Sequence, residues 1–229
     1  MRGKRVEGKQ VEPGGQRRGV RSSRPGEASV SKGSSKAPGR FARAPAQVRI
    51  IGGQWKRTAL PVADAPGLRP SPDRVRVTVF NWLAHFFPEF GACSGLDLFA
   101  GTGALGFELA SRGAARVTLV ERNPALVAGL QRTKQKLNAE AVTIMAGDAL
   151  AYARSAPDRS FDVVFLDPPF DGDLLRPALD AASRLVTSGG VVYAESGVPL
   201  EPTVAANSGL RIVRAGRAGQ VHFHLLQRA

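Results

Sequence analysis

The residues with the clearest chemical signature are Asp167-Pro168-Pro169-Phe170, which follow the apolar run 163–166. The prolines lack backbone N–H donors, so the motif offers acceptors: the Asp167 carboxylate and the Pro168 carbonyl. Two acceptors suit an exocyclic amino group, whose nitrogen lone pair they would aim at an electrophile. Phe170 offers a face on which a nucleobase, flipped out or already unpaired, can stack. The alternative is a turn that ends the strand, with Asp167 as a cap.

A glycine-rich turn, Gly101-Thr-Gly-Ala-Leu-Gly106, follows an apolar run that reaches Asp97. Glycines let backbone amides approach a ligand closely at the positive end of the next helix. Open α/β sheets bind nucleotide-like cofactors at such a turn. The pattern fits G-x-G-x-x-G, and Glu121 lies 20 residues after Gly101. An acid there can hold the ribose hydroxyls of NAD or of S-adenosylmethionine.

Two carboxylates favour S-adenosylmethionine. Asp97 would face an ammonium better than a pyrophosphate, and Asp148 follows the third strand, where it could accept a hydrogen bond from an adenine amino group. Asp148 could instead only cap the next short helix, and Glu121 could be a surface acid at a strand end. The candidate cofactor-binding residues are Asp97, Phe99, Ala100, Gly101, Thr102, Gly103, Gly106, Glu121, Arg122, Asp148 and Ala149.

Basic residues near the start of the domain suit a nucleic acid. Residues 48–62 predict two short strands about Gly52-Gly53. Trp55, Lys56 and Arg57 then combine an aromatic face with two positive charges, as a nucleic-acid strand requires, although Trp55 could instead pack on the domain. Further cations lie around the next helix and either contact a polyanion or solvate the helix start: Arg69, Arg74 and Arg76.

The formal charge of +13 is concentrated at the amino terminus, where residues 1–47 contain 12 Lys and Arg and 3 Asp and Glu. A basic excess favours polyanions through counterion release, although it could serve solubility alone. Residues 1–46 are rich in Gly, Ser, Pro and Arg and cannot bury enough apolar area to offset their ordering entropy. We predict a disordered basic tail, either an arm that binds a polyanion or an extension without a role.

Several classes of protein are disfavoured. No apolar run approaches the ~18 residues of a membrane helix, and the start lacks the apolar core of a signal peptide, so we expect a cytoplasmic protein. Cys93 is the only cysteine, which excludes a disulfide framework and predicts a buried thiol. His222 and His224 alternate with apolar residues and predict an exposed strand face, so we expect no metal site. We expect a monomer.

From Gly95 onward, strand-like and helix-like segments alternate. Before them, Ser71 as N-cap and Pro72 predict a helix that runs to about Phe87. The order predicts an α/β fold, with a mostly parallel sheet, helices on both faces and an antiparallel edge from the last two segments. Predicted strands are 95–99, 116–121, 142–146, 161–166, 190–194, 211–215 and 220–226, and predicted helices are 103–112, 124–137, 149–154 and 173–186.

Asp167-Pro-Pro-Phe170 resembles the catalytic motif of S-adenosylmethionine-dependent amino-methyltransferases of DNA and RNA, and residues 97–106 resemble their cofactor motif. Residues 49–56, 67–70, 73–76 and 79–83 are similar to those of the bacterial 16S rRNA (guanine(966)-N2)-methyltransferase family. The likeness runs from about Val48 to the C-terminus and implies a Rossmann-like, class I, seven-stranded methyltransferase fold that acts on the small ribosomal subunit or its assembly intermediate.

The resemblance implies that Asp167, Pro168 and Phe170 hold the guanine and that residues 47–66 form a β-hairpin extension of a methyltransferase domain over 67–229. The chain departs from the family at Val77, where a glutamate is common, so a role for that acid does not carry over. Three alternatives remain open: amino-methylation of another base such as adenine N6, an RNA-binding assembly factor, and an NAD oxidoreductase, which the proline pair disfavours.

Overall fold

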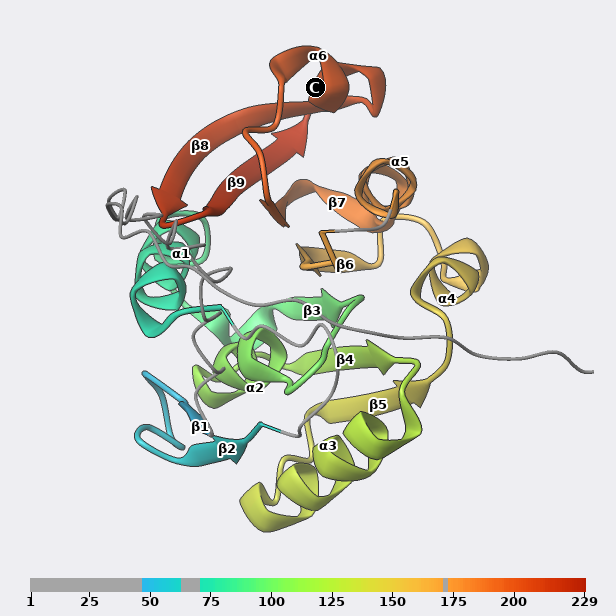
Figure 1. Cartoon of the computed structure of the whole chain (residues 1–229). Helices are drawn as coiled ribbons and strands as arrows, with labels where there is room; N and C mark the ends of the chain where they lie inside the picture. The colour runs from blue at the N-terminus through green and yellow to red at the C-terminus, as the bar shows by residue number, and fades with distance from the viewer. Residues whose placement is uncertain (1–46, 63–70, 171–172) are drawn as a thin grey trace, which may run out of the picture. The chain divides into compact units, whose positions relative to one another are not determined.

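The computed structural model of the 229-residue chain describes residues 47–62, 71–170 and 173–229. The predicted tail over 1–46, residues 63–66 of the extension, and Arg69 lie outside the described residues. Two short strands form an antiparallel pair, β1 (Gln47–Arg49) and β2 (Ala59–Pro61). The remaining strands form one sheet (Figure 1).

This sheet has seven strands in the order β5-β4-β3-β6-β7-β9-β8. The first five are parallel, and β9 and β8 add the antiparallel edge that the sequence predicted. The strand bounds are β3 Ser94–Asp97, β4 Arg116–Glu121, β5 Val142–Ala146, β6 Phe161–Leu166, β7 Val186–Ser196, β8 Leu210–Ala218 and β9 Val221–Arg228.

Helices cover both faces of the sheet. On one side α2 and α3 pack against β3, β4 and β5, and on the other α5 packs against β6 and β7 (Figure 1). Asn123 caps α3 as predicted, since its side chain accepts hydrogen bonds from two amides of the first turn. The helix bounds are α1 Asp73–Phe86, η1 Phe90–Ala92, α2 Ala104–Ser111, α3 Pro124–Leu137, α4 Ala149–Ser155, α5 Leu175–Leu185 and α6 Pro202–Asn207.

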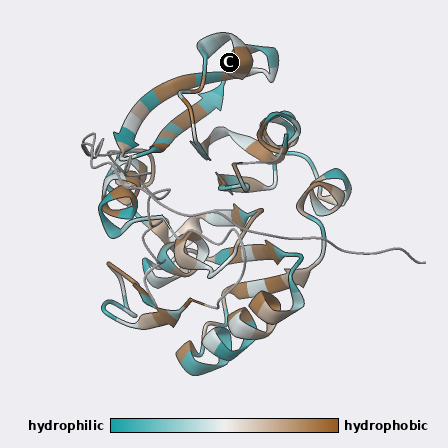
Figure 2. Cartoon of the chain, viewed as in Figure 1, coloured by the Kyte–Doolittle hydropathy of each residue, from teal (hydrophilic) through white to brown (hydrophobic). Residues whose placement is uncertain are grey.

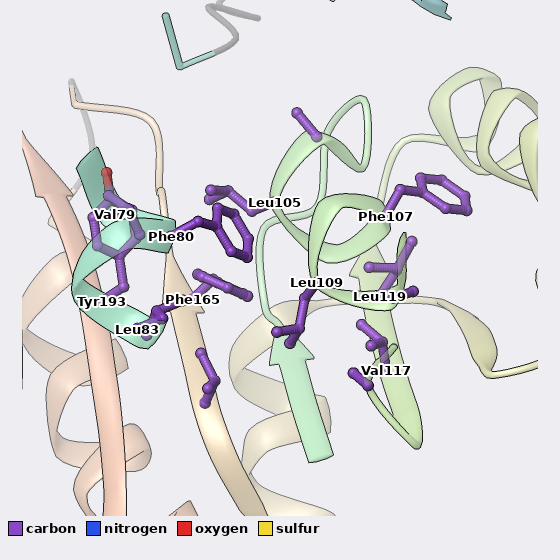
Figure 3. Close-up of a cluster of buried hydrophobic side chains, with 14 of the residues drawn as sticks. Val79, Phe80, Leu83, Leu105, Phe107, Leu109, Val117, Leu119, Phe165 and Tyr193 are labelled. Atoms are coloured by element: carbon purple, nitrogen blue, oxygen red, sulfur yellow. The ribbon is translucent and has the colours of Figure 1, made fainter. Parts of the chain in front are cut away.

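Each face of the sheet has its own apolar core. In one, Phe80 and Leu83 of α1 meet Phe165 of β6 and Tyr193 of β7 (Figure 3). Cys93 is buried beside this cluster, as predicted, and burial raises the pKa of its thiol to about 12. The second core packs β6 and β7 against α4 and α5. Hydrophobic residues accordingly lie along the inner strands, whereas hydrophobic and hydrophilic residues alternate along β8 at the edge of the sheet (Figure 2).

The structure corrects three predictions of local structure. The segment 54–58 is a loop and not a strand, because it is closed by local turn bonds: the amide of Lys56 donates to the carbonyl of Gly53, and the amide of Thr58 to the carbonyl of Trp55. The strand predicted over 190–194 begins at 186, directly after α5. His224 is buried, not exposed, because β9 lies between β7 and β8 and the chain at Leu200 covers the ring, where the Leu200 amide donates to Nε2. Burial lowers the pKa of this imidazole.

Among the described residues, no helix is long and apolar enough to cross a membrane. The same part of the chain contains no group of three or more His, Cys, Asp or Glu side chains placed to hold a metal ion.

Candidate active site

The structure brings the two chemical motifs to one edge of the sheet. Strands β3 and β6 are parallel neighbours, and Asp97 at the end of β3 lies opposite Phe165. The amide of Leu98 donates to the carbonyl of Phe165 at 3.2 Å. Asp167 is two residues farther along, so the glycine turn and the Asp-Pro-Pro-Phe motif leave the sheet side by side, at the carboxyl ends where open α/β sheets bind ligands.

The glycine turn requires its glycines. Gly101 and Gly103 have positive φ angles of 52° and 77°, which residues with a side chain rarely adopt. Gly103 is also the N-cap of α2, so free amides of the first turn face the end of β3. Gly106 has a packing role: a Cβ placed there would lie 2.0 Å from a methyl group of Leu119 on β4.

Asp97 is a buried carboxylate with one free oxygen. Its Oδ2 accepts from the amide of Gly106 at 3.1 Å, whereas Oδ1 is buried without a hydrogen-bond partner. Burial is the main cause that raises the pKa of this carboxyl to about 7, and the charge of Glu121 adds to it. A buried carboxyl group with an oxygen that has no hydrogen-bond partner is suited to bind a cationic group of a ligand.

Glu121 lies at the end of β4 and supports the turn. Its Oε2 accepts from the amide of Gly101 at 2.9 Å and its Oε1 from the amide of Asn123 at 2.8 Å. A carboxylate has about four lone-pair sites, so each oxygen retains acceptor capacity for hydroxyl groups. The glutamate is therefore fixed beside the turn, as a ribose-binding acid would need to be.

Asp148 caps α4, which was the alternative reading of this residue. Its Oδ1 accepts from the amide of Ala151 at 2.8 Å, and the side chain is exposed. Oδ2 remains available for a donor. A pocket of about 280 Å³ adjoins it, lined by Val120, Met145, Ala146, Gly147, Asp148, Ala151, Tyr152 and Ser155. The other candidate cofactor residues comprise exposed Arg122, half-buried Phe99 and Thr102, and buried Ala100 and Ala149.

Asp167 is half-buried and has acidic neighbours. Desolvation, followed by the charges of Glu195 and Asp97, holds the pKa of its carboxyl well above the usual range. Ser71 lies 3.4 Å from its Oδ2 and acts in the opposite direction. Phe170 is 43% exposed, a large value for a phenylalanine, and packs over Gly197, where an added Cβ would lie 3.4 Å from the ring.

The predicted nucleic-acid residues fall into two groups. Lys56, Arg57 and Arg74 are exposed, while Trp55 is half-buried and packs on the core. Arg76 differs from the prediction: it is fully buried and pairs with Asp73 at 2.6 Å, and with Glu108 at 3.9 Å. Its partner on α2 lies 32 residues away, so the local sequence could not place this guanidinium in the interior.

Comparisons with known proteins identify the family. The sequence model of a family described as Conserved hypothetical protein 95 matches residues 48–227. Ribosomal RNA small subunit methyltransferase D of Escherichia coli (strain K12) is 41% identical over 185 residues, which cover 80% of this chain and 90% of that protein. The chain belongs to this family. The protein of the same name from Haemophilus influenzae is 38% identical over 157 residues, 66% of this chain and 79% of that one.

The methyltransferase D family also accounts for the architecture. A solved structure of the Escherichia coli protein yhhF has a TM-score of 0.68 at 36% identity and covers 80% of this chain and 98% of that chain. The fold is therefore the Rossmann-like class I methyltransferase fold, with its antiparallel hairpin at the carboxyl terminus. Both the family and the fold that the sequence motifs predicted are confirmed.

The sequence did not predict three residues that lie behind Asp167: Ser71, Tyr193 and Glu195. Ser71 was predicted to cap α1, but Pro72 is the N-cap and makes no side-chain cap, while the Ser71 hydroxyl donates to Glu195. Tyr193 also donates to Glu195, at 2.7 Å. One signal was present in the sequence: an acid at the end of the apolar run 191–194 is costly to bury without a purpose.

Proposed function

We propose that this protein transfers a methyl group from S-adenosylmethionine to the exocyclic N2 amine of a guanine in 16S rRNA. The substrate is the small ribosomal subunit or its assembly intermediate, and the protein acts as a monomer in the cytoplasm. The family relation supports rRNA methylation, since the Escherichia coli relative is named for methylation of small-subunit rRNA. The choice of guanine N2 rests on the residues of the site and on the family resemblance.

The observation that carries the proposal is the side-by-side placement of Asp97 and Asp167 at the ends of adjacent strands. One carboxylate has a buried oxygen without a partner, and the other heads a motif with acceptors only. A cation can therefore sit beside an amino group at the same edge of the sheet. Methyl transfer from a sulfonium to an amine needs this pair of sites.

The residues present fit S-adenosylmethionine. The unpartnered Oδ1 of Asp97 suits its ammonium, and the free capacity of the Glu121 carboxylate suits its ribose hydroxyls. Asp148 Oδ2 suits the adenine amino group, beside the pocket that this residue helps to line. When bound, the cofactor supplies an electrophilic methyl group on a sulfonium sulfur.

The Asp-Pro-Pro-Phe motif positions the nucleophile. The Asp167 carboxylate and the Pro168 carbonyl accept the two N2 hydrogens, which aims the nitrogen lone pair and offsets its delocalisation into the ring. Phe170, with its exposed face, stacks on the base. Positioning of this kind supplies much of the rate enhancement when two reactants are held at contact distance. The proton that the amine loses passes to the Asp167 carboxylate.

In this proposal, exposed basic side chains bind the phosphates of the RNA. Lys56 and Arg57 lie on the loop between β1 and β2, and Arg74 lies in the first turn of α1. Phosphate contacts position an RNA without reading its sequence. Arg76 takes no part, because it is buried.

Incubation with methyl-labelled S-adenosylmethionine and unmodified small subunits tests the proposal, with nucleoside analysis of the 16S rRNA. We expect the label in N2-methylguanosine, and a loss of about 10²-fold or more in Asp167→Asn, whose amide replaces an acceptor oxygen by a donor. Label in N6-methyladenosine would move the target to another base. No label in any nucleoside, with the protein folded and cofactor bound, would refute methyl transfer to this RNA.

A further inference from the structure

Asp167 is backed by three buried polar side chains that the proposed reaction does not use. Ser71 precedes α1, and Tyr193 and Glu195 lie on β7. The Ser71 hydroxyl donates to Oε1 of Glu195 and lies 3.4 Å from Oδ2 of Asp167. The Tyr193 hydroxyl donates to the same Oε1 at 2.7 Å. Ser71 is thus the link between two carboxyl groups.

Four charged or titratable side chains face Asp167 or its link. Asp97 approaches from β3, Glu195 and Tyr193 from β7, and the Arg76 guanidinium from α1, where its Nε lies 3.4 Å from the carbonyl of Ser71. Burial raises the pKa of Glu195, while Ser71, Tyr193 and Arg76 lower it. Asp167 has one long contact, to Ser71, that lowers its pKa. The two hydroxyl donors and Arg76 thus favour the ionised form of Glu195, and the charge of Glu195 opposes ionisation of Asp167.

We propose that Ser71 and Glu195 are positioning residues for Asp167: Glu195 fixes the Ser71 hydroxyl between the two carboxyl groups, and its charge makes Asp167 a stronger base. The inference deepens the proposed methyl transfer and rests on it. The carboxylate that holds the amine then has both a fixed orientation and a tuned affinity for a proton.

The methyl transfer releases a proton, and the pair of carboxyl groups provides an acceptor for it. As N2 forms a bond to the methyl carbon, the bond from that carbon to sulfur breaks, with its electron pair left on sulfur. The methylated nitrogen then carries a positive charge and one proton in excess. Asp167 takes this proton, and the negative charge of Glu195 at its back favours the transfer.

The conformation at Ser71 supports a role beyond folding. A serine at this position next to Pro72 is well suited to cap α1, yet the hydroxyl makes no cap bond and turns to the two acids. Two carboxyl groups brought this close reduce stability, so their retention in the interior fits a role in the reaction.

The test is the pH dependence of kcat/KM in two variants with opposite expected shifts. Glu195→Gln removes the neighbouring charge but keeps the shape, so the acid limb should move to lower pH, by on the order of one unit. Ser71→Ala removes the one side-chain contact that lowers the pKa of Asp167, so the acid limb should move to higher pH. Carboxyl ¹³C titration of Asp167 in the free protein should shift in the same two directions. A role in folding alone predicts lower stability and no movement of either titration.

Ser208→Ala is the matched control, because this buried serine, the C-cap residue of α6, also donates to a carboxylate, that of Asp180 and not one of the site. It should lower stability without moving the acid limb. If Asp167→Asn abolishes methylation while Glu195→Gln and Ser71→Ala leave both titrations unchanged, the positioning role is wrong and the proposed function stands. If the wild-type protein methylates nothing, the proposed function fails, and the ¹³C titration still decides how Glu195 acts on Asp167.

Discussion

Glu108 and Glu195 are both buried glutamates, and their hydrogen-bond partners differ. Glu108, on α2, accepts hydrogen bonds from the amides of Ile51 and Gly52 and from the Arg112 guanidinium, with the guanidinium of Arg76 at 3.9 Å. Its charge is balanced by cations and amide dipoles. Glu195 accepts hydrogen bonds from two hydroxyl groups and lies near a second acid, so its charge is balanced less completely, although the Arg76 guanidinium also acts on it.

The same contrast separates two regions of the molecule. The region around Glu108 joins the segment between β1 and β2 to α2, and Ser111 completes the joint by accepting hydrogen bonds from the amides of Gln54 and Trp55. The region around Asp97 and Asp167 contains acids with open acceptor capacity. Buried acids with full partners stabilise a fold, whereas acids left short of partners cost stability and mark a place for a ligand.

The largest test of this contrast is Glu108→Ala. The change leaves Arg76 buried without its main interior acid and frees two amides, so unfolding free energy should fall by about 3–5 kcal/mol. Urea denaturation measures the loss, and Glu140→Ala, at an exposed position, is the control that should change little. The folded fraction of the variant should still bind cofactor. A loss of under 1 kcal/mol would show that the joint is not structural.

Asp97→Asn should raise the free energy of unfolding at high pH, whereas Glu108→Ala lowers it. Its folded-state pKa of about 7 lies above the ordinary value of 3.8, so the stability tied to this carboxyl is complete below about pH 4 and is lost as pH rises through 7. At pH 8 the asparagine variant should therefore be more stable than the wild type by roughly 2–4 kcal/mol, since each pKa unit corresponds to about 1.4 kcal/mol.

The gain should shrink as pH falls toward 4, which unfolding curves at several pH values would follow. Calorimetry should meanwhile show that Asp97→Asn has lost affinity for S-adenosylmethionine, because a neutral amide cannot balance an ammonium. A variant that is less stable than the wild type at every pH would place Asp97 among the structural acids and remove the contrast.

Phe170→Ala tests whether the exposed part of the site serves only the substrate. Loss of the stacking face should raise the free-energy barrier that kcat/KM reports by about 1–3 kcal/mol, the range for stacking one base on an aromatic ring. The melting temperature should not change. Val77→Ala is a fair control, because Val77 is 40% exposed and Phe170 43%. Equal effects of the two substitutions would argue that no base stacks at Phe170.

The sequence predicted the part of the fold that local patterns determine. Four strand and helix ranges, 116–121, 124–137, 142–146 and 161–166, have the bounds that periodicity and turn residues indicated. The mostly parallel sheet with helices on both faces followed from the alternation of strands and helices, because such crossovers join parallel strands. The order of the strands in the sheet was not predicted. The motifs at Asp97 and Asp167 follow strand ends, which is why their proximity could be foreseen.

Contacts between distant segments were not predictable in this way. Ser71 carries a cap signature, but its hydroxyl found Glu195, 124 residues later in the chain. Arg76 looked like a surface cation because its buried partner lies on another helix. His224 alternates with apolar residues, as on an exposed face, but the position of β9 inside the sheet buries it. In each case the tertiary partner, absent from any local window, decided the environment.

Lys56→Ala gives the smallest and most selective test, because it asks whether the structural extension also has a function. Lys56 is exposed on the loop that Glu108 and Ser111 hold in place. If it contacts one phosphate, its loss should weaken RNA binding a few-fold and lower the slope of log K against log salt by about 1, with stability unchanged. Lys136→Ala, on the exposed side of α3, is the matched control. Identical salt slopes for the two variants would confine the extension to its structural role and leave the RNA to other cations.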